Sequence, residues 1–124
     1  MSRETIESML PRLLEFRRER EWEQFHLPKE LATALSIEAG ELLELFLWRQ
    51  HESHEDVKSN QERMERIREE VADVLIYLVF LSNDLGIDLP AAIASKLAKN
   101  EIKYPASEYR GRFSLPYPKR TRKP

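Results

Sequence analysis

The sequence predicts an all-α fold in the form of a small four-helix bundle, and three observations lead to this prediction. The 124 residues include only three glycines, and 34% of them are charged, a composition typical of long helices. Apolar residues recur at every third or fourth position in four stretches, which are separated by proline, glycine or polar residues. No stretch combines strict alternation of apolar and polar residues with turn signals, so no strand is predicted.

The first helix is predicted from about Glu4 to Arg20, where apolar residues recur at helical spacing. Its charged residues are interpreted as a solvated face: Glu15, Arg17, Arg18, Glu19 and Arg20. A connector from Glu21 to Pro28 follows, and Pro28 suits the first turn of the next helix.

The second helix is predicted from about Lys29 to Gln50, and a polar loop from His51 to Asn60 follows it. The third helix is predicted from about Gln61 to Leu85. It begins highly charged and becomes almost wholly apolar from Val71 to Leu81, which predicts a central position packed on several sides.

The fourth helix is predicted from its end signals. Gly86 ends the third helix, and Asp88 and Pro90 then suit the cap and first turn of a helix that runs to about Lys103. Pro105 stops that helix. An apolar central helix in so small a bundle favours dimerisation, because an apolar face is then buried against a second copy.

The chain is predicted to hold one helical domain, residues 1–105, followed by a proline-rich basic tail, residues 106–124. From Tyr104 onward there are six basic side chains and one acidic one. Such a tail could bind nucleic acid, but its prolines favour an extended solvated arm or a segment that wraps a neighbouring subunit.

Composition excludes several classes of function. The chain has no cysteine, which excludes disulfides, thiolate zinc sites and cysteine nucleophiles. The polar N-terminus lacks the apolar core of a signal peptide, and no run of apolar residues is long enough to cross a membrane. We therefore expect a soluble cytoplasmic protein with no membrane partner.

Two carboxylate pairs, Glu38 with Glu41 and Glu70 with Asp73, interrupt the apolar stretches of the second and third helices. Residues three apart share one face of a helix, so each pair directs two carboxylates the same way. Either pair alone would be read as an ordinary solvated face. Because both lie in apolar segments, and because converging buried anions are costly without a cation, the pairs predict a hard divalent metal site.

Aromatic residues continue the same faces. Glu44 and Trp48 extend the row from Glu41 along the second helix, and Tyr77 follows Asp73 by one turn on the third. Taken singly, such aromatics are more often core or interface residues. Beside a metal site they could stack on a flat base.

A row that is positively charged, in contrast to the carboxylate rows, is predicted on the fourth helix. It consists of Lys96, Asn100 and Lys103. Taken alone, these would be ordinary surface residues. With acids on two helices and amines on a third, the sequence indicates a pocket for a metal-bound polyanion that carries a base.

Other metal and phosphate chemistries fit the sequence poorly. A ferritin-like di-iron site needs two Glu-x-x-His motifs, and the one present, Glu23 with His26, lies in the predicted connector. His51 and His54 lie in a polar loop without a plausible third zinc ligand. There is no glycine-rich phosphate loop and no serine nucleophile motif.

From about Leu13 to Pro105 the sequence resembles the MazG-like all-α nucleoside triphosphate pyrophosphohydrolases, and within them the dCTP pyrophosphatase branch. Five blocks that occur in order support the resemblance: Trp22 to His26, Glu38 to Leu42, Leu45 to Trp48, Glu70 to Leu78, and Lys96 to Pro105.

The resemblance implies a role for each candidate residue. It implies that Mg²⁺, with Mn²⁺ as the alternative, is bound by four carboxylates: Glu38, Glu41, Glu70 and Asp73. It assigns the phosphates to Lys96, Asn100 and Tyr104, and Lys103 joins them from the same row. It assigns the base and sugar to Trp22, His26, Trp48 and Tyr77. It also implies a homo-oligomer, either a dimer or a tetramer built from dimers.

The implied reaction is hydrolysis of a nucleoside triphosphate to a monophosphate and pyrophosphate, in a role of nucleotide-pool sanitation. The catalytic residues would be the four carboxylates, with Glu41 as the group that activates the water. By resemblance the substrate is dCTP or a modified relative. Two alternatives remain open: a non-catalytic sensor module that binds Mg²⁺ and nucleotide, and a structural dimerisation bundle.

Overall fold

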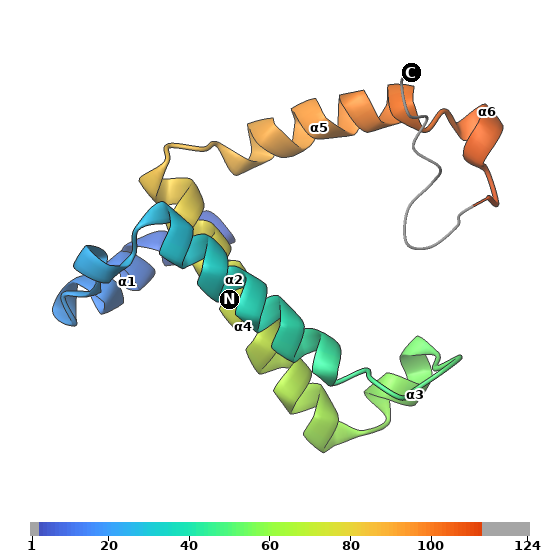
Figure 1. The fold of residues 1–124 in the computed structure, drawn as a ribbon, viewed down its shortest axis with the longest axis horizontal. Coiled ribbons are helices and arrows are strands. Elements are labelled where there is room, and N and C mark those ends of the chain that lie inside the picture. Colours follow the sequence, from blue (N-terminus) through green and yellow to red (C-terminus); the bar gives the residue numbers. More distant parts are fainter. Residues whose placement is uncertain (1–2, 113–124) are drawn as a thin grey trace. The chain divides into compact units, whose positions relative to one another are not determined.

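The structure, a computed structural model, describes residues 3–112, and within this range it contains helices and no strand, as the sequence predicts. Figure 1 shows the elements along the chain. Their order is α1 (Ile6–Glu19), the 3₁₀ helix η1 (Trp22–Phe25), α2 (Pro28–Glu44), α3 (His54–Lys58), α4 (Gln61–Asp84), α5 (Leu89–Lys103) and α6 (Ala106–Tyr109).

The chain divides into two compact units, one spanning Met1–Gly86 and one that begins at Ile87. The first unit contains α1 to α4, and the second contains α5 and α6. The predicted division into residues 1–105 and 106–124 stays a prediction, because the tail beyond residue 112 lies outside the described range.

The first unit is built on the antiparallel pair of α2 and α4, which lie side by side over most of their length (Figure 1). The apolar side chains with the least exposure, Leu31 on α2 and Val79 and Phe80 on α4, lie in this unit. The predicted central packing of α4 is therefore strongest near its C-terminal end, whereas Val71 is 48% exposed.

Helix starts follow from local capping. The side chain of Thr5 accepts a hydrogen bond from the backbone N–H of Ser8 and begins α1, and Asn60 does the same for the N–H of Arg63 at the start of α4. The predicted cap at Asp88 is confirmed, since its side chain accepts from the N–H of Ala91. Gly86 has a φ of 66°, a backbone conformation that suits glycine after a helix end.

Three segments predicted as irregular or extended contain short helices. The connector after α1 forms η1, the predicted loop from His51 to Asn60 contains α3, and the first residues of the predicted extended tail form α6. The reason for α3 is a capping box, in which Ser53 and Asp56 exchange side-chain to backbone hydrogen bonds of 3.0 and 3.1 Å.

The predicted end of the second helix was wrong. The helix stops at Glu44 instead of near Gln50. Arg63 on α4 donates its Nε–H to the carbonyl oxygen of Leu45 at 2.8 Å, and its two terminal nitrogens donate to Glu52 at 2.6 and 2.8 Å. These bonds hold the chain in a turn where the apolar pattern alone would have continued the helix.

No single helix within residues 3–112 is long and apolar enough to span a membrane; α4 and α5 reach that length and composition only when they are counted together across their break.

Candidate metal and nucleotide site

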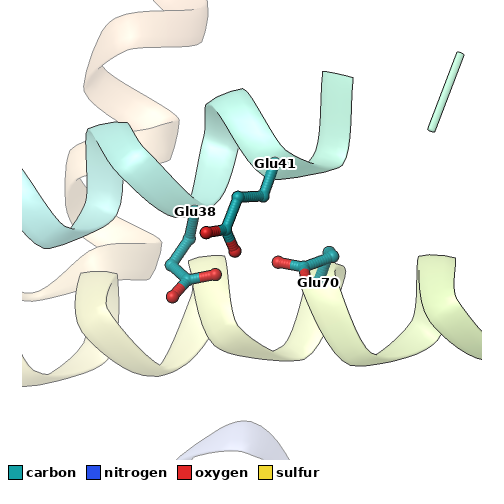
Figure 2. Close-up of side chains that lie close together, drawn as sticks. All are labelled: Glu38, Glu41 and Glu70. Carbon is teal, nitrogen blue, oxygen red and sulfur yellow. The ribbon is translucent and has the colours of Figure 1, made fainter. Parts of the chain in front are cut away.

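Three carboxylates converge between α2 and α4. Glu38 and Glu41 lie three residues apart on α2, and Glu70 faces them from α4, so that all three side chains point into the space between the two helices (Figure 2). One carboxylate oxygen from each lies within 4.8 Å of the others. The antiparallel packing of α2 and α4 thus brings together acids from the two halves of the predicted metal motif.

The electrostatics of this cluster are unfavourable without a cation. The Oε2 atoms of Glu38 and Glu70 are buried and find no hydrogen-bond partner within the described part of the chain. Burial, followed by the neighbouring Glu70 and Glu41 carboxyl groups, raises the pKa of Glu38 from 4.5 to about 7. Carboxylate oxygens without protein partners are the ligands that hard divalent cations prefer, so the donor set fits such an ion.

Asp73, the fourth predicted ligand, is not one of the three converging acids. It lies close enough for its charge to raise the pKa of Glu38 and, after the effect of burial, that of Tyr77. Its role as a ligand stays a prediction.

Three of the predicted base-binding residues form an aromatic cluster with a fourth residue that the sequence did not single out. The ring of His26 lies 6.2 Å from Trp22, 6.4 Å from Tyr77 and 5.4 Å from Phe80, measured between centroids. Phe80 follows Tyr77 by three positions on α4, and this spacing is the signal that could have identified it. We refer to Trp22, His26, Tyr77 and Phe80 as the aromatic cluster.

His26 is the polar member of this cluster. Its Nδ1 atom is buried and has no hydrogen-bond partner among the described residues. Burial, and then the positive charge of Arg17, lower the pKa of the His26 imidazole. The ring is therefore neutral near pH 7 and has both a hydrogen-bond donor and an acceptor.

Trp48 does not continue the carboxylate row along a helix, and that prediction was wrong. Because α2 ends at Glu44, Trp48 lies in the turn that follows, with a φ of 65° and 97% of its surface exposed. A contact between Trp48 and a base stays a prediction.

The predicted phosphate-binding residues belong to the second unit. On α5, Lys96 and Asn100 line a shallow hollow of about 340 Å³ together with apolar side chains. At the end of α5, the Nζ atom of Lys103 lies 5.2 Å from the ring centre of Tyr104, whose ring packs edge-on against Tyr109 at 5.3 Å. The expected face of Lys96, Asn100 and Lys103 is thus present as a helical row, and its contact with phosphates stays a prediction.

The prediction that Arg17 is exposed to solvent was wrong. Arg17 was expected on a solvated face, but it is only 6% exposed, and its two terminal nitrogens donate to the Asp84 carboxylate at 2.8 and 2.9 Å. The four other charged residues of that face are exposed: Glu15, Arg18, Glu19 and Arg20. A charged run gives no local signal for the one member that has a buried partner far along the chain.

Comparison with known proteins finds matches over most of the chain. A model of the MazG-like family matches residues 33–112. The chain is 46% identical over 103 residues to human dCTP pyrophosphatase 1, covering 82% of this chain and 60% of the relative. It is 40% identical over 110 residues to the bovine dCTP pyrophosphatase 1, covering 89% of this chain and 65% of the relative. The chain thus spans less than two thirds of the length of these curated relatives.

A solved structure extends the comparison to the fold. The chain matches the crystal structure of a pyrophosphatase from Archaeoglobus fulgidus with a TM-score of 0.73 and 43% sequence identity. The match covers 85% of this chain and 96% of the other.

Proposed function

Since this chain belongs to the MazG-like family, we propose that it is a nucleoside triphosphate pyrophosphohydrolase, which cleaves its substrate to a nucleoside monophosphate and pyrophosphate. The single observation that supports this most strongly is the cluster of Glu38, Glu41 and Glu70, with its two buried and unpartnered oxygens. The names of the relatives, all dCTP pyrophosphatase 1, make dCTP or a modified relative the first substrate to test.

The carboxylates would hold Mg²⁺, with Mn²⁺ as the alternative, and Asp73 would complete the set. The bound ion would neutralise phosphate oxygens and make a water molecule more acidic. Glu41 is the most exposed of the three converging acids and is the group that we propose accepts the water proton. The water oxygen then bonds to the α-phosphorus, the bond to the bridging oxygen breaks, and pyrophosphate leaves with the electron pair.

The remaining candidate residues would bind either the base and sugar or the phosphates of the substrate. The base and sugar would contact Trp22, His26, Tyr77 and Trp48, because aromatic faces stack on any base. The buried Phe80 would support the His26 ring from α4. On the phosphate side, Lys96 and Lys103 supply positive charge, and Asn100 and Tyr104 supply neutral hydrogen-bond donors.

We propose that the active form is a homo-oligomer, either a dimer or a tetramer built from dimers. Helix α5 supports this, because Ile93, Leu97 and Ile102 are 66%, 56% and 83% exposed in the single chain. Apolar side chains at this density on one helix are typical of an interface. A cytoplasmic location and a role in clearing unwanted nucleotides complete the proposal.

Pyrophosphate release from the common and several modified triphosphates, with and without Mg²⁺, tests this function. We expect Mg²⁺-dependent release, fastest with dCTP or a modified form of it. A sensor module would show a nucleotide-dependent rise in melting temperature without pyrophosphate. A structural bundle would show neither, whereas ligand at 100 times its Kd stabilises a binding protein by about 2.7 kcal/mol.

A further inference from the structure

Arg17 on α1 and Asp84 near the end of α4 form a two-pronged ion pair across 67 positions of sequence. The Arg17 side chain is almost fully buried, and Asp84 is about a quarter exposed. Among the described residues this is the one ion pair that joins α1 to α4. A planar guanidinium that meets a carboxylate with two parallel hydrogen bonds fixes orientation as well as distance.

The pair lies directly beside the aromatic cluster. The central guanidinium carbon of Arg17 lies 4.6 Å from the centre of the Phe80 ring, and His26 lies 5.4 Å from that same ring. Trp22 is held from the α1 side, where its ring packs edge-on against Phe16 at 5.6 Å. The segment that contains Trp22 and His26 is therefore anchored to α4 through the residues that surround Arg17.

Two buried polar atoms without a hydrogen-bond partner belong to residues that pack around the Phe80 ring. Besides Nδ1 of His26, the Nε atom of Arg17 is buried with no hydrogen-bond partner in the described structure. Arg17 uses its two outer nitrogens on Asp84 and keeps its inner N–H free. A buried donor and a neutral imidazole around one aromatic ring are unusual for a purely structural core, in which polar groups are paired.

We propose that Arg17, held by Asp84, is a positioning residue for base selection: it fixes η1, with Trp22 and His26, against Tyr77 and Phe80 of α4. This inference rests on the proposed function, because it takes the aromatic cluster to be the base side of the site. The contacts of the ion pair are with Phe80 and Asn83 and include none of the three converging carboxylates. Its effect is therefore expected on binding and discrimination of the base and not on the chemical step.

The decisive variant is the double substitution Arg17→Met with Asp84→Leu. Replacing a buried ion pair by apolar residues of similar size is often neutral for stability, whereas Arg17→Met alone would leave Asp84 unpaired. We expect the double variant to fold and to keep its Mg²⁺-dependent kcat within about threefold. We expect KM for the preferred triphosphate to rise about tenfold, and the preference over the other bases to narrow. Arg18→Met, an exposed change on the same helix, is the control and should leave both constants unchanged.

A second measurement does not depend on turnover. The ring nitrogen and carbon NMR signals of His26 in the metal-free protein should shift or broaden in the double variant and stay unchanged in Arg18→Met. Unchanged His26 signals, or an unchanged KM and base ranking in the folded double variant, would overturn the proposal. If the wild-type protein released no pyrophosphate while the His26 signals still responded, the positioning of His26 would be supported and the proposed function would be refuted.

Discussion

Glu38 links proton binding to metal binding at the candidate metal site. Its carboxyl group lies beside Glu41 and Glu70 and has one buried, unpartnered oxygen. With a pKa of about 7 it is about half protonated at neutral pH, where an ordinary glutamate has lost its proton. A cation that binds there must displace this proton, so metal affinity should fall as the pH drops below 7.

The same pKa predicts how the stability of the metal-free protein depends on pH. Between about pH 4.5 and 7 the folded protein retains a proton on Glu38 that the unfolded chain has released. The free energy of unfolding should therefore decrease as the pH rises through this window. Urea unfolding at several pH values, without metal, measures this slope. Glu38→Gln should flatten it and Glu44→Gln should not; equal slopes in Glu38→Gln and the wild type would contradict the assignment.

The Glu41→Gln substitution separates catalysis from folding. It should lower the rate of pyrophosphate release by roughly 10²- to 10⁴-fold, because the proposed proton acceptor is lost. The melting temperature of the metal-free variant should equal or exceed that of the wild type, because one converging charge is removed.

The control for Glu41→Gln is Glu44→Gln, one turn along α2 and outside the cluster of three acids. An equal loss of activity in both variants would indicate a general effect of charge on α2. Asp73→Asn tests the fourth predicted ligand in the same assay. Turnover at the wild-type rate in that variant would exclude Asp73 from the set.

At the scale of elements, the starts of the four long helices were predictable, whereas the end of α2 was not. The start of α5 followed from Asp88 and Pro90, because caps and prolines act within one turn of the chain. The end of α2 depends on Arg63, which bonds to Leu45 and Glu52 from another helix. No local pattern encodes such a contact. Arg17 was misplaced for the same reason, since its partner lies on α4.

Asn60 tests the capping of α4 directly. Its side chain accepts from the N–H of Arg63 at 3.0 Å. Asn60→Ala should lower the free energy of unfolding by about 1 kcal/mol, because that N–H loses its partner. Asn60→Asp keeps an acceptor and should lose much less. Chemical denaturation of the two variants measures the difference, and equal stabilities would contradict the capping role.

The sequence predicted the candidate site only for residues whose position follows from their spacing along a helix. Spacing placed Glu38 and Glu41 on one face of α2, and the antiparallel pairing of α2 with α4 brought Glu70 to them. The contact of His26 with Phe80 depends on how η1 folds back, and that fold is set by tertiary contacts.

At the scale of the whole molecule, much apolar surface remains uncovered in the single chain. Exposed apolar side chains occur on α5 in the second unit and, separately, on α2 in the first unit, where Ile37 and Leu43 are 56% and 60% exposed. A chain of this size gains stability by burying such surface against further copies.

The proposed oligomer is tested by Ile102→Glu, which places a charge at the most exposed apolar position of α5. Light scattering coupled to size exclusion should show a smaller particle than the wild type, because an interface cannot easily bury an unpaired carboxylate. The conservative control Ile102→Val should keep the wild-type mass. An unchanged mass in Ile102→Glu would remove this part of α5 from the interface.

The packing contact between α1 and α4 is small, and this has a consequence for how a nucleotide would enter the site. Helices α2 and α4 share a long contact, whereas α1 meets α4 at few positions. Among residues 3–112 the one ion pair between α1 and α4 joins Arg17 to Asp84. Segments with few buried contacts open first in native-state fluctuations. Opening of α1 would draw Trp22 and His26 away from Tyr77 while Glu38, Glu41 and Glu70 stayed together. In the proposed enzyme a base would then exchange through a transient gap between α1 and α4 while the three carboxylates kept their arrangement. Amide hydrogens of α1 would exchange with solvent before those of α4.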